Sequence, residues 1–242
     1  MDSPAAAGEE ILMSALLNTP AFGILLSVVA FEAGIIVSRK TKNPLLNPLL
    51  VAIILVILFL MGFGIPKEQY DSGGSFILFF LGPATVVLAV PLYKQIELLK
   101  KDLVAILLGI LVGSTTSIMS VILLSRLFNV DLSIAVSMLP KSVTTAIGME
   151  ISKEIGGIVS LSVAVIVLTG ITGAVIGPGL LKLFRITDEV AQGIAIGTAS
   201  HAVGTSKAME LGETQGAMSG LSIGIAGIAT VILVPLFIGL LG

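Results

Sequence analysis

Long apolar runs separated by short polar connections dominate the sequence and set the predicted architecture. A membrane-spanning helix needs about 20 predominantly apolar residues. Eight segments near that length run over 11–37, 45–65, 75–92, 103–124, 132–151, 155–181, 190–209 and 217–241. No connection between them is long enough for a soluble domain. The pattern therefore predicts an all-α, polytopic integral membrane protein, with residues 1–242 forming a single transmembrane domain.

Composition supports this class. The 242 residues are 55% hydrophobic and only 12% charged, whereas soluble domains carry roughly 25% charged residues. A net charge of -2 without a basic tract argues against a nucleic-acid partner. The absence of cysteine excludes disulfides, and one histidine without clustered carboxylates predicts no metal and no cofactor. Residues 1–10 lack the positive charge that begins a signal peptide, so we expect the first apolar run to span the membrane.

Positive charge in short loops predicts orientation. Arg39 and Lys40 follow the first segment, and Lys100 and Lys101 follow the third, so both connections should be cytoplasmic. With eight full crossings, Lys182 and Arg185 fall outside, against the rule. If 132–151 were re-entrant instead, both would move inside, and charge alone leaves the two topologies open.

Three segments carry interruptions at mid-length, near 82–85, 140–145 and 199–206. Proline removes a backbone donor and clashes with the preceding turn, so we expect discontinuous helices there. Transporters commonly bind substrate at such breaks, because the N-terminus of a restarted helix attracts anions. These breaks predict a substrate-binding site, to which the first would contribute Pro83 and Thr85.

The second break combines one lysine with three hydroxyls. If the helix restarts after Pro140, then Lys141, Thr144 and Thr145 project from one face. Together with Ser142 they suit a small carboxylate that bears a neighbouring hydroxyl or keto oxygen. Alternatively, Lys141 snorkels to the interface while the threonines bond back to the helix.

The third break contains the chain's one histidine. His201 and Thr205 are four residues apart, as are Ser200 and Gly204, so each pair shares a face if the segment is helical. We assign all four to the substrate site and expect His201 to couple proton movement, because its ordinary pKa lies near 6.5. The alternative is a neutral imidazole held by packing and a hydrogen bond.

Glycine pairs four residues apart recur in the second half of the chain. Such spacing lets helix backbones approach closely. It is consistent either with tight packing or with a smooth face along which one helix group slides, and it occurs at Gly109/Gly113, Gly173/Gly177, Gly193/Gly197 and Gly220/Gly224.

Several stretches resemble the LrgB/CidB family, and the resemblance spans nearly the whole chain. They are 81–86 with 91–93, 140–145, 170–174 and 197–205. After Thr145 the chain reads Ala146-Ile147-Gly148, where many members have a proline. Bacterial members are named antiholin-like proteins that modulate murein hydrolase activity and cell lysis with a small LrgA/CidA-type membrane partner. A plant chloroplast relative exchanges glycolate and glycerate, and other bacterial pairs are linked to pyruvate uptake.

The leading hypothesis is a secondary transporter of small monocarboxylates such as glycolate, glycerate, lactate or pyruvate, in a prokaryotic plasma membrane. The alternative is an antiholin-like regulator of lysis that acts with an LrgA/CidA-like partner. An intramembrane hydrolase is disfavoured, because no carboxylate is evident to orient a Ser142–His201 pair, so we expect no enzyme activity. The glycine faces make a homodimer plausible.

Overall fold

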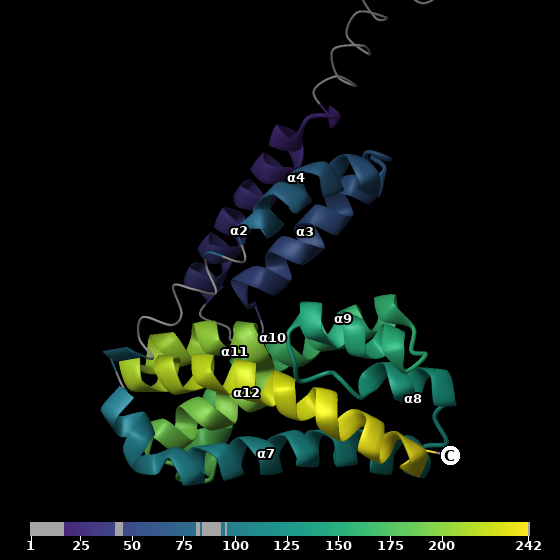
Figure 1. Ribbon diagram of the computed structural model, residues 1–242. Helices are drawn as coiled ribbons and strands as arrows, with labels where there is room; N and C mark the ends of the chain where they lie inside the picture. Colours follow the sequence, from purple (N-terminus) through teal and green to yellow (C-terminus); the bar gives the residue numbers. More distant parts are fainter. Residues whose placement is uncertain (1–16, 42–45, 81–82, 84–92, 95, 242) are drawn as a thin grey trace, which may run out of the picture. The chain divides into compact units, whose positions relative to one another are not determined.

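The computed structural model describes residues 17–41, 46–80, 83, 93–94 and 96–241 (Figure 1). The chain divides into two compact units, Met1–Val87 and Leu88–Gly242. Each unit is described by itself below.

The first unit packs two helices against α2. It contains α2 (Pro20–Thr41), α3 (Pro48–Gly62) and α4 (Lys67–Phe79). Gly23 of α2 faces Gly73 of α4, where a Cβ on Gly23 would lie 3.0 Å from the Gly73 Cα. A hydrogen bond of 2.9 Å between the Ser27 and Tyr70 hydroxyls holds the same pair of helices. The segment predicted at 75–92 overlaps only the end of α4, and most of it lies outside the described residues.

The second unit is larger and is also built from helices. Among its described residues, the α-helices with defined bounds are α7 (Ile96–Leu127), α8 (Leu132–Met138), α9 (Thr145–Glu154), α10 (Val159–Leu183), α11 (Glu189–Leu211) and α12 (Glu213–Phe237). Across the described residues of both units, four helices are long and apolar enough to cross a membrane: Pro20–Thr41, Lys100–Leu127, Val159–Leu183 and Glu213–Leu240. The predicted all-α membrane architecture is confirmed.

Residues 132–154, here called hairpin A, do not form the predicted crossing helix. The chain enters along α8, turns at 139–144 and returns along α9. The Ser162 hydroxyl donates to the Ser137 carbonyl at 2.7 Å and also lies 2.7 Å from the Ser152 hydroxyl, so the two arms lie together beside α10. At 7 and 10 residues, the arms are about 10 and 15 Å long, too short to cross alone. The prediction of a full crossing at 132–151 is therefore wrong, and the re-entrant alternative is right.

Helix α11, here called hairpin B, also folds back on itself. A Cβ on Gly193 would lie 2.8 Å from the Met218 Cβ, and a Cβ on Gly216 would lie 3.1 Å from the Met209 Cα. Residues 193 and 209 would be about 24 Å apart on a straight helix, yet they contact the same turn of α12. The reversal occurs at His201, whose φ of 44° and ψ of -138° are not helical. The predicted crossing at 190–209 is therefore also wrong, although the predicted break near 199–206 is confirmed.

The two hairpins enter the unit from opposite sides. Helices α7 and α12 run in the same direction, because Ile106 clusters with Met218 near their starts and Ile118 with Val234 further along. Hairpin A connects the end of α7 to the start of α10, and hairpin B connects the end of α10 to the start of α12. Both reach Ile166 in α10: its side chain lies against Gly148 of hairpin A, and its carbonyl bonds His201 of hairpin B.

With eight full crossings, Lys182 and Arg185 would fall on the outer side, against the positive-inside rule. The observed topology resolves this conflict. In the described part of the second unit, the side where α7 begins carries Lys94, Lys100, Lys101, Lys182, Arg185 and Lys207. The opposite side carries Arg126 and Lys153. By the positive-inside rule the first side is cytoplasmic, and Lys182 and Arg185 now obey the rule.

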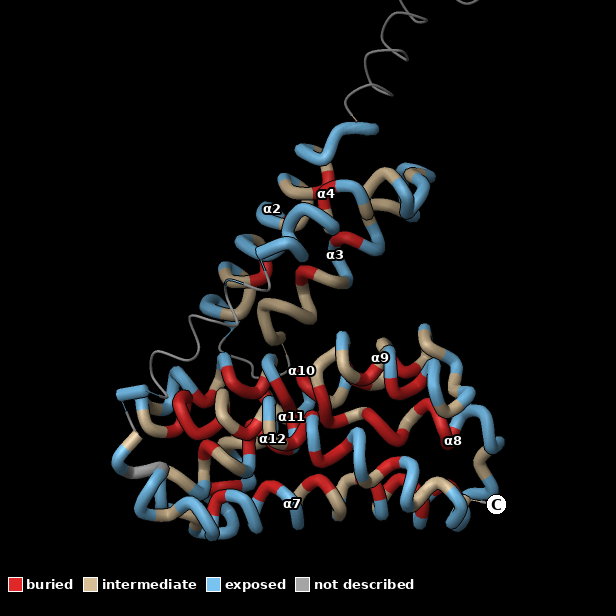
Figure 2. The backbone as a smooth tube through the Cα atoms, in the orientation of Figure 1, coloured by how far each residue is buried: buried red, intermediate tan, exposed pale blue. Residues whose placement is uncertain are grey.

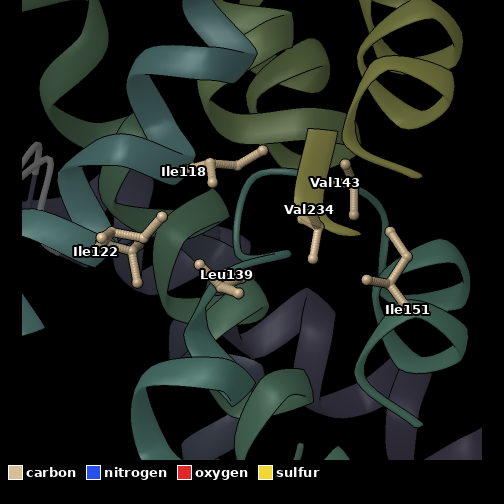
Figure 3. Packing of buried hydrophobic residues seen from close by; sticks show 7 residues of the cluster. Ile118, Ile122, Leu139, Val143, Ile151 and Val234 are labelled. Carbon is tan, nitrogen blue, oxygen red and sulfur yellow. The ribbon is translucent and has the colours of Figure 1, made fainter. Parts of the chain in front are cut away.

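Buried residues concentrate where the hairpins meet the long helices (Figure 2). Leu139 and Val143, in the turn of hairpin A, are each 1% exposed. They pack against Ile118 and Ile122 of α7 and Val234 of α12 (Figure 3). The apolar residues on either side of Lys141 thus anchor the turn that carries it.

Candidate functional site

Lys141 lies in the turn of hairpin A, beside α7. Its Nζ donates to the Ser117 hydroxyl at 3.0 Å and to the Ser142 hydroxyl at 3.2 Å. The two hydroxyls are 2.8 Å apart. Among the residues that the structure describes, no carboxylate lies within 4.0 Å of the Lys141 ammonium. Its positive charge is therefore solvated by hydroxyls but not neutralised.

The expected helical face of Lys141, Thr144 and Thr145 does not form. Helix α9 begins at Thr145 with Thr144 as its N-cap, so Lys141 precedes the helix. Pro140 does not restart the helix directly, because residues 139–143 form turns held by bonds such as Lys141 N to the Met138 carbonyl, 3.1 Å. Thr144 makes no side-chain cap bond to the first turn of α9. The two threonines do not line the pocket described next.

A pocket of about 1160 Å³ runs between α7, α10 and hairpin B, with Lys141 at one end. Ser117, Ser120 and Ser142 line this end together with the lysine. Asp102 and Asp188 line the cytoplasmic end, where α7 begins and α10 has ended. The pocket therefore extends from Lys141 to the cytoplasmic side of this unit.

Of the residues predicted in the third break, only Ser200 lines the pocket. His201 is 3% exposed and lies behind it, with Nε2 3.0 Å from the Ile166 carbonyl. Because a carbonyl only accepts, that nitrogen carries the proton. The Thr205 hydroxyl is 2.7 Å from that of Ser219 and 3.0 Å from the His201 carbonyl, and Gly204 packs against Ser200. The predicted role of His201 in proton coupling stays a prediction.

Two glycines of α10 make room for this turn. A Cβ on Gly170 would lie 2.7 Å from the His201 ring, and one on Gly173 would lie 2.6 Å from the Ser200 Cβ. The spacing of these glycines is thus explained by the close approach of hairpin B. Thr198 of hairpin B also lines the pocket, and its buried hydroxyl has no partner within the described ranges.

The predicted contribution of the first break, Pro83 and Thr85, stays a prediction. Pro83 belongs to the first unit, where it is exposed. Thr85 lies outside the described residues.

Sequence reasoning missed Ser117 and Ser120. Both lie on α7, in a helix predicted as an ordinary apolar crossing. A signal was present, since the polar run Ser114-Thr115-Thr116-Ser117 interrupts the apolar pattern near mid-length. Hydroxyls in membrane helices often bond back to the backbone, as Thr115 does to the Leu111 carbonyl at 2.8 Å, so such a run alone predicts no site.

The arrangement is suited to hold an anion. An uncompensated ammonium away from bulk water is costly, and a bound carboxylate would offset that cost. Ser117 and Ser142 can donate to its oxygens, and the uncapped N-terminus of α9 begins three residues beyond Ser142.

Comparison with known proteins identifies the family. The sequence model of the LrgB-like family matches residues 27–240. Proteins named antiholin-like protein LrgB from Bacillus cereus (strain B4264) and Bacillus anthracis (strain CDC 684 / NRRL 3495) are each 38% identical over 225 residues, covering 93% of this chain and 98% of the relative. No solved structure matches the chain significantly. With its apolar helices, the chain is a multi-pass bacterial membrane protein, and it belongs to the LrgB-like family.

Proposed function

We propose that this protein is a secondary transporter of small monocarboxylates, such as glycolate, glycerate, lactate or pyruvate. The observation that carries the proposal is Lys141, a cation without a carboxylate partner among the described residues, at the end of a large pocket. The substrate carboxylate would bind the Lys141 ammonium, and Ser117 and Ser142 would contact the remaining oxygens.

The arrangement of the hairpins supports transport. Transporters often place substrate between inverted elements, and alternating access then comes from the movement of one element against another. Here hairpins A and B enter from opposite sides and both contact Ile166. A substrate on Lys141 would lie beside both turns, since Ser200 of hairpin B lines the same pocket.

Uptake into proteoliposomes tests the proposal. Hydrogen bonds to charged groups contribute about 1.5–3 kcal/mol, so replacing the ammonium should lower uptake at limiting substrate roughly 10- to 150-fold. We expect that loss for Lys141→Met with labelled glycolate or lactate. Lys153→Met is the matched control, because Lys153 is exposed at the end of the same hairpin. Equal uptake by wild type and Lys141→Met would remove the lysine from any substrate site.

A second candidate function rests on the names of the relatives. At 38% identity over nearly their whole length, those proteins are named antiholin-like, and this favours a regulator of murein hydrolase activity that acts with a small LrgA/CidA-like partner. Such a regulator would work through surfaces that contact the partner and would not need an interior cation. In a host that lacks its own copy, intact lysis control by Lys141→Met combined with His201→Ala would favour the regulator.

A further inference from the structure

The pocket beside Lys141 is far larger than a two- or three-carbon acid needs. Its lining extends along α7 from Asp102 to Ser120, about 27 Å at 1.5 Å per residue. Its volume of about 1160 Å³ exceeds the roughly 300–1,000 Å³ common for drug-sized ligands. Beyond the lysine and the serines, the walls are mainly aliphatic, and they include Ile106, Val112, Leu168, Ile176, Leu180 and Ile194.

Such a space needs an apolar occupant. Along the aliphatic parts of the wall, a water molecule finds few of the two to four polar partners that it needs. An empty space would forfeit the dispersion contacts of its lining. Because Leu168 and Ile176 are among the exposed side chains of α10, hydrocarbon chains of the bilayer are the nearest material that fits.

The glycines of the pocket do not leave a surface ready for another helix. Hairpin B already packs against them: a Cβ on Gly113 would lie 2.9 Å from the Thr198 Cγ2, and one on Gly177 would lie 3.8 Å from the Ile196 Cγ1. A fatty acid supplies both the chain and the carboxylate.

We propose that this pocket binds one unesterified fatty acid from the bilayer. Its carboxylate would bind Lys141, Ser117 and Ser142, and its chain would extend between α7 and α10 toward the cytoplasmic end. From Ser117 to Ala105 the pocket is about 18 Å long, which accommodates roughly 14 carbons at about 1.25 Å each along an extended chain. The fatty acid competes with small carboxylates for Lys141 and so inhibits their transport.

Native mass spectrometry of the full chain released from phosphatidylcholine nanodiscs tests the site. The probes are tetradecanoate and its uncharged analogue tetradecanol. We expect one tetradecanoate per chain and at least tenfold less tetradecanol. Lys141→Met should lower tetradecanoate occupancy at least tenfold, because it removes the charge that holds the carboxylate.

Two glycine variants test where the chain lies. Gly177→Leu adds a side chain inside the pocket and should also lose tetradecanoate. Gly179→Leu is the matched control, because an added Cβ there meets nothing within 4 Å and Gly179 does not line the pocket. It should bind tetradecanoate as wild type does.

Three results would each overturn the inference: equal binding of acid and alcohol, full occupancy in Lys141→Met, or equal loss in both glycine variants. Co-release of a protein partner in place of the lipid would also overturn it. The proposed transport is tested separately by uptake. If uptake requires Lys141 but no tetradecanoate adduct forms, the proposed transport stands and the fatty-acid site is refuted. If the wild-type protein carries the adduct but takes up no small acid, the fatty-acid site stands and the proposed transport is refuted.

Discussion

Hairpins A and B both reach the interior of the second unit, yet different forces hold them. Hairpin A turns over several residues and is tied to α10 by Ser137, Ser152 and Ser162, each 0% exposed. Hairpin B reverses at His201 and is held on α12 by close backbone approach at Gly193 and Gly197. Both hairpins also use the other kind of contact, since His201 and Thr205 form hydrogen bonds from hairpin B and Leu139 and Val143 pack in hairpin A. The contrast is one of emphasis: buried serine hydroxyls join hairpin A to α10, and close backbone approach at glycine joins hairpin B to α12.

Because glycines of hairpin B lie against the backbone of α12, a larger side chain at one of them should lower the free energy of unfolding strongly. We expect Gly197→Val to lower the free energy of unfolding by about 3 kcal/mol or more, since its Cβ would lie 2.7 Å from the Ser219 Cα and backbone must move. Thermal unfolding followed by circular dichroism measures the change. Gly224→Val in α12 is the control, because an added Cβ there meets nothing within 4 Å. Equal stability of the two variants would contradict the close packing of hairpin B.

Sequence patterns predicted the all-α architecture and the breaks near 140–145 and 199–206, but not how these two breaks fold, and the predicted break near 82–85 lies mostly outside the described residues. Pro140 and the polar residues near 199–206 interrupt apolar runs, and a helix break at such a position can be predicted from the neighbouring residues alone. Whether an interrupted segment continues across the membrane or returns depends on tertiary contacts. For hairpin B, Gly193 and Met209 contact α12; for hairpin A, the contacts are with Ser162 of α10. Because the length of an apolar run says nothing about such contacts, it predicted two crossings that do not form.

The site was predictable in part for the same reason. Lys141 and Ser142 stand out as polar residues in an apolar segment, whereas Ser117 becomes relevant only because hairpin A places Lys141 beside α7. The predicted helical face of Lys141 with Thr144 and Thr145 does not form, because residues 139–143 form turns and α9 begins only at Thr145.

In hairpin A, hydroxyl removal should be the damaging change. Ser162→Ala leaves the Ser137 carbonyl and the Ser152 hydroxyl without this buried hydrogen-bond partner, and an unsatisfied buried group costs about 1–3 kcal/mol. We expect a loss in that range by the same unfolding measurement. Ser206→Ala in hairpin B should change stability by less than about 0.5 kcal/mol, because the Ser206 hydroxyl is exposed. A neutral Ser162→Ala would show that the serine contacts do not hold hairpin A.

A smaller effect is expected where hairpin A meets α7. Ser117→Ala removes one of the two hydroxyls that contact Lys141 but keeps its charge. With a typical net hydrogen bond of about 1 kcal/mol, uptake of glycolate at limiting concentration should fall roughly fivefold. Ser114→Ala is a matched control three residues away, since the buried Ser114 hydroxyl has no partner in the part of the chain that the structure describes. A loss for Ser117→Ala as large as for Lys141→Met would mean that the serine positions the lysine as well as contacting substrate.

An effect of similar size separates the backbone conformation of His201 from the contacts of its side chain. A φ of 44° with ψ of -138° resembles the first central position of a type II′ turn, which favours glycine. His201→Ala loses the bond to the Ile166 carbonyl and keeps the backbone strain, whereas His201→Gly loses the same bond and relieves the strain. The glycine variant should therefore be more stable than the alanine variant by about 1 kcal/mol, measured by thermal unfolding of the two proteins side by side. Because both variants lack the imidazole, their difference reports the turn alone, and a more stable alanine variant would mean that the segment at 201 is helical and that hairpin B does not reverse there.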